Sequence, residues 1–176
     1  MRYDTYPGKY NRIRKGGFEI DGEPAQPAAA GCIVSGGFTG DMRLLTCDGY
    51  VPFAELSLAP GTMPMLIDAN GSLVAGKVLY ASHRPTVGIT LLTGKRIRCV
   101  MEQSFMICQG HEVAAHDLFG KRLRLAPGSD EDEAPLVLAV TPAGKDEDVY
   151  AFAICGGGTW GCVEGHIARC CVWTKE

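Results

Sequence analysis

The sequence has few aromatic residues and no long apolar run, and both shortages limit what the chain can be. Phe, Trp and Tyr together make up 8% of the 176 residues. No run reaches about 18 consecutive apolar residues, the length that a membrane-spanning helix needs. The start of the chain also lacks the apolar core of a secretory signal peptide. We therefore expect a protein that is cytoplasmic at synthesis and has no membrane partner.

Excess charge of either sign is also missing. The chain has 17 Lys and Arg against 20 Asp and Glu, a net charge of −3, so its composition indicates no specific nucleic-acid partner. Cysteine is abundant, with eight residues. Their spacing does not match a small secreted disulfide framework, and we expect reduced thiols.

Glycine and proline are plentiful, with 23 and 10 residues, and they favour turns over long helices. In residues 40–56, GDMRLLTCDGYVPFAEL, the Asp48-Gly49 pair predicts a hairpin turn, and Ala54–Leu56 predicts a brief helical exit. Similar hairpins are predicted in residues 65–75 and 87–100. Repeated short strands joined by such turns indicate an all-β fold.

Segments spread along the chain resemble, in order, the motifs of the Hint fold, which inteins, hedgehog autoprocessing domains and bacterial intein-like domains share. They are residues 40–56, 87–99, 105–118, and a closing pair at 149–154 and 165–171. The resemblance implies a compact, pseudo-twofold β domain over residues 37–171, with its first and last strands close together. Residues 1–36 would be an extended N-terminal arm and linker, and residues 172–176 a C-terminal tail.

The apolar positions of these segments predict the core of the domain. The expected core residues are Leu44, Val51, Leu66, Ile89, Leu91, Ile97, Phe105, Leu118, Leu123, Val149 and Ile154.

The resemblance also implies where chemistry should occur. A Hint domain begins with a Cys or Ser that attacks the carbonyl before it. The corresponding position here, four residues before Asp41, is Gly37, which has no side chain. Cys32 and Ser35 are the nearest nucleophiles, and Cys32 lies five residues too early. If Gly36 and Gly37 form a bulge, Cys32 reaches the position; otherwise it is an idle or buried thiol.

The other implied catalytic positions also hold unusual residues. The family's Thr and the His three residues later polarise and protonate the scissile amide, and they correspond to Val100 and Gln103. The closing His and Asn correspond to Arg169 and Cys170, and cysteine cannot cyclise as asparagine does. Cys171 holds the position of the downstream nucleophile.

A cluster near the C-terminus offers a different chemistry, that of a metal site formed by Cys155, Cys162, His166, Cys170 and Cys171. The spacing of Cys162, His166 and Cys170 places soft ligands near each other, but the paired C-x2-C motifs of structural zinc are absent. We expect no metal and no cofactor. His166 also lies three residues too early to replace the missing His.

These observations favour a non-catalytic Hint-fold module with a structural or assembly function over an enzyme. Hint domains are frequent on phages, so the resemblance implies a small head–tail or tail component of a virion. The alternative is a self-processing, intein-like domain that uses Cys32 and Cys171, with His166, for autocatalytic cleavage or splicing.

The N-terminal arm is the expected docking segment. It is basic and contains residue types that anchor interfaces, namely Tyr3, Tyr6, Tyr10, Arg12 and Arg14. We expect it to bind other protein subunits in a homo-oligomer or a larger assembly, with the acidic residues 130–133 of a like subunit as one docking point. The alternative is a solvated tail.

Overall fold

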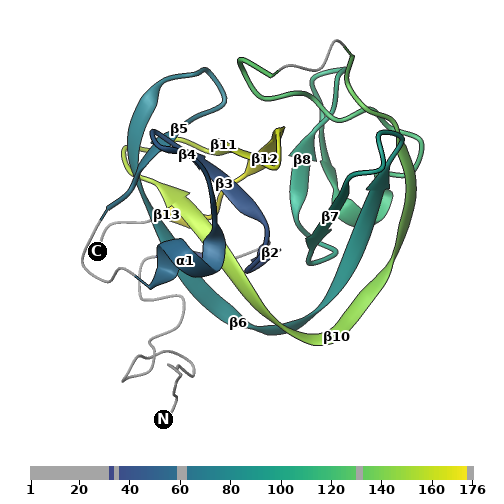
Figure 1. Cartoon of the computed structure of the whole chain (residues 1–176), viewed down its shortest axis with the longest axis horizontal. Coiled ribbons are helices and arrows are strands. Elements are labelled where there is room, and N and C mark those ends of the chain that lie inside the picture. Colours follow the sequence, from purple (N-terminus) through teal and green to yellow (C-terminus); the bar gives the residue numbers. More distant parts are fainter. Residues whose placement is uncertain (1–31, 34–35, 59–62, 130–132, 174–176) are drawn as a thin grey trace.

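The computed structural model describes residues 32–33, 36–58, 63–129 and 133–173, which form an almost entirely β structure (Figure 1). The elements are β1 (Cys32–Ile33), β2 (Phe38–Thr39), β3 (Arg43–Thr46), β4 (Gly49–Pro52), α1 (Phe53–Ser57), β5 (Met65–Ile67), β6 (Leu73–Leu91), β7 (Arg96–Cys99), β8 (Ser104–Met106), β9 (Glu112–Ala114), the 3-10 helix η1 (Ala115–Asp117), β10 (Val137–Ile154), β11 (Trp160–Val163), β12 (His166–Arg169) and β13 (Val172–Trp173). The predicted all-β class is confirmed. No helix in the described ranges is long and apolar enough to cross a membrane.

The strands β6 and β10 form a long antiparallel ribbon that passes beneath both halves of the molecule (Figure 1). Their pairing extends from Gly76–Ile154 at one end to Leu91–Val137 at the other. The register shifts at several points, one of them beside Pro142. Such shifts bend a ribbon and tolerate a proline that cannot donate to the ladder, which allows one ribbon to serve two halves.

The predicted hairpins are confirmed. β3 pairs with β4 across a turn at Cys47 and Asp48, one residue earlier than predicted, because Gly49 already pairs with Thr46 as the first residue of β4. The short helix α1 then follows as the helical exit. β5 pairs with the start of β6, and the end of β6 pairs with β7. In the other half β8 pairs with β9, and η1 follows. The repeated order of hairpin and helical turn is the pseudo-twofold element of the fold.

Two short strands lie outside the predicted domain boundaries. β1 falls in the predicted arm and β13 in the predicted C-terminal tail, yet they pair with each other, Cys32 opposite Trp173 and Ile33 opposite Val172. The backbone N–H of Cys171 donates to the carbonyl of Phe152 in β10, at 2.8 Å. The segments that flank the domain are therefore joined at the edge of the body.

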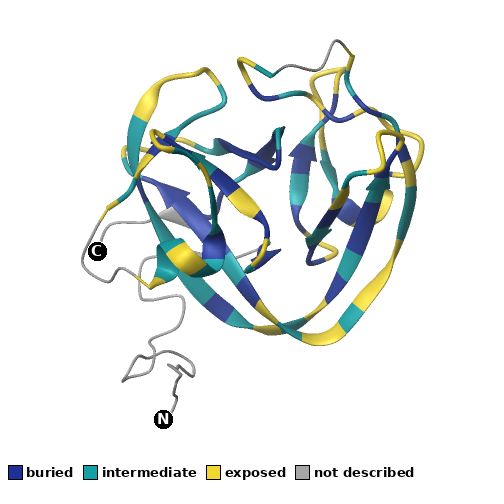
Figure 2. Ribbon diagram, viewed as in Figure 1, coloured by how far each residue is buried: buried dark blue, intermediate teal, exposed yellow. Residues whose placement is uncertain are grey.

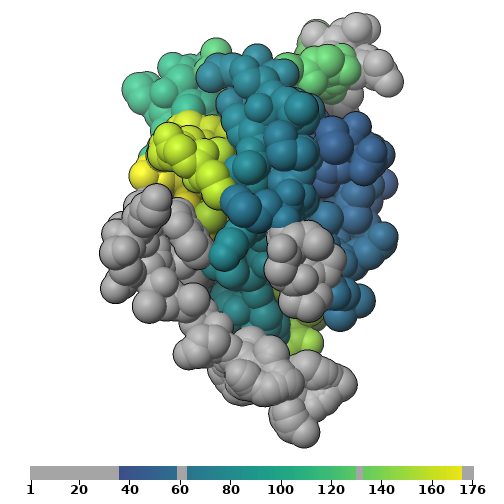
Figure 3. Space-filling model, turned by 90° about the vertical axis from the view of Figure 1, so that its left-hand side faces the viewer, coloured from purple at the N-terminus to yellow at the C-terminus, as the bar shows by residue number. Residues whose placement is uncertain are grey.

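The core lies between the ribbon and the two halves, and it contains ten of the eleven predicted residues (Figure 2). The exception is Val51, which is half-buried. Within the described sheet β4 pairs with β3 alone, so one side of Val51 stays accessible. Figure 3 shows the face along which β6 passes.

Buried phenylalanines connect the segments that carry the Hint motifs. Phe38 of β2 stacks on Phe53 of α1, with ring centroids 5.3 Å apart, and meets Phe105 of β8 edge-on at 5.9 Å. Phe53 also contacts Phe152 of β10. Aromatic pairs in these geometries contribute more than their buried area alone. They bring the first, middle and closing motifs to one place.

Candidate functional site

The position assigned to the nucleophile lies just before β2, at Gly36 and Gly37. Gly37 has φ +155°, and a Cβ there would lie 2.3 Å from Cγ1 of Val149. A Cβ at Gly36 would lie 2.3 Å from Oε1 of Gln103. Both distances are far below van der Waals contact, so a side chain at either position would displace its neighbour. A cysteine or serine at position 37 would force the stiff Val149 side chain to shift, and a residue at position 36 would displace the amide of Gln103.

Gln103, at the position assigned to the catalytic His, is buried and connects the two ends of the domain. Its Oε1 accepts a hydrogen bond of 2.8 Å from the N–H of Gly37. Its Nε2 donates to the carbonyls of Ser104 and Arg169, both at 2.9 Å. Val100 uses its backbone N–H to reach the carbonyl of Gly37, at 3.0 Å. The side-chain amide of Gln103 thus uses both its oxygen and its nitrogen in hydrogen bonds to the backbone.

The closing residues Arg169, Cys170 and Cys171 all lie at this site. The guanidinium of Arg169 lies 5.8 Å from the Trp160 ring centroid and forms a 2.5 Å ion pair with Glu112. The Cys170 thiol donates to the carbonyl of Gly158, at 3.3 Å. The guanidinium of Arg169 is therefore engaged by Trp160 and Glu112, while its backbone carbonyl bonds to Gln103.

These residues enclose a cavity of about 20 Å³, called the junction cavity below. It is lined by Gly36, Phe38, Gln103, Ser104, Ala151, Phe152, Arg169, Cys170 and Cys171. This volume holds about one water molecule. The predicted meeting of the first and last strands is confirmed, because residues from both ends line one cavity. The lining residues with nucleophilic side chains are Ser104, Cys170 and Cys171.

The other predicted site residues lie elsewhere. Cys32 is in β1, and its side chain lies outside the described part of the structure. Tyr3, Tyr6, Tyr10, Arg12 and Arg14 also lie outside the described residues, as do residues 130–132 of the acidic segment. Their roles remain predictions.

His166 is fully buried in β12 and does not line the junction cavity. It lies opposite Val163 in the ladder, and neither ring nitrogen has a hydrogen-bond partner. Burial, with the positive charge of Lys95, lowers the pKa of His166 to about 4, although Glu164 partly offsets this. The imidazole is therefore neutral at pH 7 and is no substitute for the missing catalytic His.

The cysteines near the C-terminus point to separate partners. Cys162 donates to the carbonyl of Asp68, at 3.6 Å, whereas Cys170 donates to that of Gly158. Burial, with the nearby charge of Asp68, raises the pKa of Cys162 to about 12. Within the described ranges no group of three or more His, Cys, Asp or Glu side chains is arranged to hold a metal ion.

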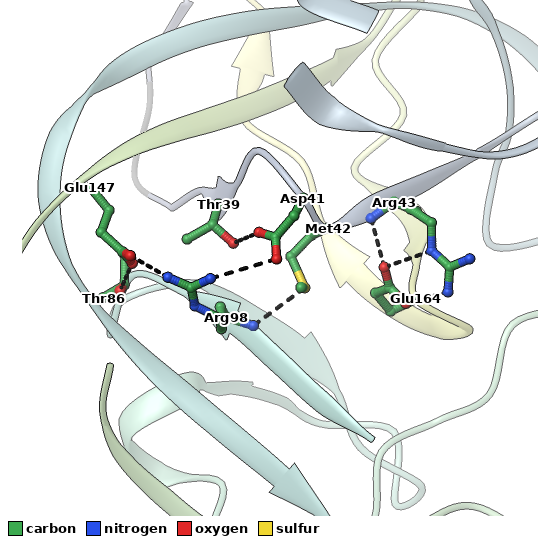
Figure 4. A network of polar contacts seen from close by, with 8 residues as sticks. All are labelled: Thr39, Asp41, Met42, Arg43, Thr86, Arg98, Glu147 and Glu164. Carbon is green, nitrogen blue, oxygen red and sulfur yellow. Dashed lines mark hydrogen bonds and ion pairs between the residues drawn. The ribbon is translucent and has the colours of Figure 1, made fainter. Parts of the chain in front are cut away.

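A polar network connects the first motif to the second and to the ribbon (Figure 4). Arg98 of β7 pairs with Glu147 of β10 and, at 3.5 Å, with Asp41. Glu147 also accepts from Thr86 of β6, at 2.5 Å, and Asp41 accepts from Thr39, at 2.6 Å. This network fixes β2 and β7, which support the junction cavity from beside it.

The sequence motifs gave no site role to four residues that line the junction cavity, Phe38, Ser104, Ala151 and Phe152, and named Gly36 only as part of a bulge. Ser104 supplies a carbonyl to Gln103, which no side-chain pattern signals. Gly36 allows Gln103 to approach the backbone, and the doublet with Gly37 is a weak signal for that, because adjacent glycines are typical of close backbone contacts.

No protein-family model and no curated protein matches the sequence. Solved structures do match. The DnaB intein of Synechocystis sp. PCC 6803 is similar to this chain, with a TM-score of 0.66 and 14% identity, over 77% of this chain and 99% of the intein. The gp41-1 intein is similar with a TM-score of 0.61 and 16% identity, over 77% and 99% of the respective chains. A bacterial intein-like domain from Clostridium thermocellum follows, with a TM-score of 0.59 and 15% identity, over 76% and 97%.

Similarity at these identities defines the fold. It agrees with the position of the junction cavity, where the first and last motif strands meet and the second motif contributes Gln103. The chain therefore has the Hint fold of inteins and bacterial intein-like domains, as the order and spacing of its sequence motifs predicted.

Proposed function

We propose that this chain is a Hint-fold structural module that does not process itself. The observation that supports the proposal best is the environment of Gln103. Its side-chain amide forms hydrogen bonds to the backbone at Gly37, Ser104 and Arg169. At the position of the family's catalytic His, this chain therefore has a group that joins the start of the domain to its end.

The chemistry of the positions points the same way. An amide cannot transfer a proton at a useful pKa, and Gly37 has no nucleophile. Each general acid or base that is lost removes a factor of about 10²–10⁴ in rate, and several are replaced together. The remaining reaction of an unactivated amide would be too slow to matter.

Intact-mass spectrometry of the purified full chain tests this proposal. We expect one species with the mass of all 176 residues after prolonged incubation at neutral pH with a reductant. A fragment that begins at Cys32 or ends near Arg169, and that disappears in the Cys32→Ala variant, would contradict the proposal.

A second function, self-processing, is favoured by one observation: Cys171 lines the same cavity as Gly36. Its thiol would attack the carbonyl of Gly36, forming a thioester to sulfur and breaking the bond to the nitrogen of Gly37. The thiol proton would pass to the released amine. Cys32 would act instead only if residues 34–35 allowed it to reach the same carbonyl.

Mercaptoethanesulfonate distinguishes the two functions, because this small thiol cleaves thioesters by exchange and leaves peptide bonds intact, including the Asn70-Gly71 bond that hydroxylamine would attack. We expect no change in mass on treatment of the wild-type chain. Release of residues 1–36 from the wild type but not from Cys171→Ala would establish the self-processing function. Release that depends on Cys32 would assign it to that residue.

We further propose that the module assembles with other protein subunits, in a homo-oligomer or a virion, through the basic, tyrosine-containing residues 1–15. Cations at a solvated rim contribute about 0–1 kcal/mol each, so the tyrosines would supply most of the affinity. Deletion of residues 2–15 should leave the circular dichroism spectrum unchanged and abolish assembly in light scattering. Assembly that persists after this deletion would make residues 2–15 a solvated tail.

A further inference from the structure

A larger cavity, of about 340 Å³, lies apart from the junction cavity and shares none of its lining residues. Its walls come from the β3–β4 hairpin, the end of the turn between β6 and β7, residues 127–129 and the turn between β11 and β12. It is lined by Arg43, Leu45, Tyr50, Lys95, Pro127, Gly128, Ser129, Glu164 and Gly165. Because Glu164 organises its polar wall, we call it the Glu164 cavity. The functions discussed above do not use it.

Glu164 has an unusual backbone conformation. With φ 51°, it is the single non-glycine residue of positive φ in the described ranges, and it forms the two-residue turn with Gly165. A left-handed conformation costs a residue with a Cβ about 1–2 kcal/mol. Backbone strain of this kind persists where the surrounding structure requires the residue.

Glu164 forms hydrogen bonds to two basic residues, Arg43 and Lys95. Its carboxylate is buried and accepts three hydrogen bonds from Arg43: from the backbone N–H at 2.8 Å, from Nε at 3.1 Å and from Nη2 at 3.0 Å (Figure 4). Its backbone carbonyl accepts from Nζ of Lys95, at 2.9 Å. A single residue thus fixes two cations in the wall of one cavity.

Both cations keep donors that these bonds do not use. Arg43 engages Glu164 through Nε and Nη2, which leaves the edge formed by Nη1 and Nη2 for a second bidentate contact. An ammonium has three donors, and the bond to Glu164 uses one donor of Lys95. Two positive charges against one carboxylate leave the wall cationic.

The remaining wall suits a small organic ligand. Burial raises the pKa of Tyr50 to about 12, so its hydroxyl keeps its proton and can donate. Leu45 and Pro127 supply apolar surface. The volume lies at the lower end of the range for small-molecule sites, about 300–1,000 Å³.

We propose that the Glu164 cavity binds a small oxyanion ligand, a carboxylate or a phosphate, between Arg43 and Lys95. The fixed guanidinium provides the paired donors that both anions fit, and Lys95 adds a point charge. Because Glu164 already orients Arg43, binding does not have to immobilise that side chain. The site is independent of whether the chain processes itself.

Amide chemical-shift titration of the full chain tests the proposal, with sodium phosphate in one arm, sodium malonate in a second and sodium chloride at equal ionic strength in a third. We expect saturable shifts at residues 43–50, 128–129 and 164–165 with one or both oxyanions, and none that saturate with chloride. The arm that saturates at lower concentration identifies phosphate or carboxylate as the preferred chemistry.

Lys95→Gln should weaken the binding about tenfold, and Lys121→Gln, which removes an exposed lysine outside the cavity, should leave it unchanged. Arg43→Lys keeps the charge but loses the fork, and it should weaken binding further. The Lys95 variant leaves the bonds between Arg43 and Glu164 intact, so it decides the question even if Arg43→Lys unfolds. Shifts that fail to saturate, that spread over other basic residues or that survive Lys95→Gln unchanged would overturn the proposal.

Discussion

Gln103 illustrates how one side chain can define a site without performing chemistry. It is buried, and all its hydrogen bonds go to backbone groups. A buried donor or acceptor that loses its partner costs about 1–3 kcal/mol. The side-chain amide of Gln103 is therefore stable in the interior only when the backbone at Gly37 and at Arg169 is in place. The buried backbone groups there in turn need the amide as a partner.

Gln103→Ala should lower the free energy of unfolding by about 2–4 kcal/mol, because it leaves backbone groups at Gly37 and Arg169 unpaired and opens a small void. Urea denaturation measures the change. Gln109→Ala provides the matched control, since Gln109 is exposed in the β8–β9 turn, and it should change stability by less than about 0.5 kcal/mol. An equal loss of stability in the two variants would contradict the proposal that the hydrogen bonds of Gln103 stabilise the fold.

His166 is the second residue whose environment has a measurable consequence. Its pKa is about 4 in the folded chain and about 6.5 in an unfolded one. Between these values the unfolded state binds more protons than the folded state. The free energy of unfolding therefore falls as the pH drops from about 6.5 to about 4, by about 3 kcal/mol in total.

His166→Leu should remove this contribution, because leucine is apolar, suits a fully buried position and does not titrate. Stability curves of the wild type and the variant, measured from pH 7 to pH 4, should diverge steadily toward acid. Their difference isolates His166 from the carboxylates that titrate in the same range. His111→Leu, at an exposed turn position, should follow the wild type, and a constant difference for His166→Leu would contradict the assigned pKa.

At the scale of elements, the β6–β10 ribbon determines how the two halves meet. Its ladder is interrupted where the register shifts, and side chains stabilise it there. Glu147, paired with Arg84 in the ladder, extends its carboxylate to Arg98 and to the buried Thr86. The network of Figure 4 therefore connects the irregular part of the ribbon to β7 and β2.

Arg98→Met should destabilise the fold by about 1–3 kcal/mol, because the half-buried carboxylate of Glu147 would lose its cationic partner and keep only the hydrogen bond from Thr86. Arg84→Met is a matched control: both arginine side chains are 31% exposed, but Arg84 pairs with the more exposed Glu102. We expect less than about 1 kcal/mol for that surface pair. Chemical denaturation at low and high salt compares them, and a larger loss for Arg84→Met would contradict the network.

At the scale of the whole molecule, one core crosses both halves. Leu66 of β5 and Leu123, which follows β9 and η1, belong to the same cluster, and both are essentially inaccessible to solvent. The phenylalanines that meet beside the junction cavity are members of that cluster too. Because the ribbon also crosses both halves, the largest core cluster of the described residues belongs to both of them.

Leu66→Ala and Leu123→Ala should each lower stability by about 2–5 kcal/mol, through lost burial and the void left behind. Each should shift one common unfolding transition, so that urea curves followed by circular dichroism and by tryptophan fluorescence coincide. Two transitions, one sensitive to Leu66 and the other to Leu123, would show that the halves unfold separately.

Much of this architecture could be predicted from local pattern. The Asp48-Gly49 pair, and the Asn70-Gly71 pair within residues 65–75, mark their hairpins because glycine readily adopts the positive φ found at Gly49 and Gly71. Alternation along the strands places Leu44, Ile89 and Ile97 inside. The order of the motifs predicted the fold and the meeting of its ends. Val51 was the exception among the predicted core residues. It lies in β4, which pairs with β3 alone, and local pattern does not indicate which strands will have a neighbour on both sides.

The sequence by itself determined the strands, their turns and the side chains at the positions where Hint chemistry would occur, because these depend on residues close together in the chain. The tertiary structure decided what those positions contact. Gln103 reaches Gly37 and Arg169, each 66 residues away, and Glu164 reaches Arg43 across 121 residues. Contacts over such separations depend on which strands become neighbours in the fold, and no pattern within a single strand encodes that choice.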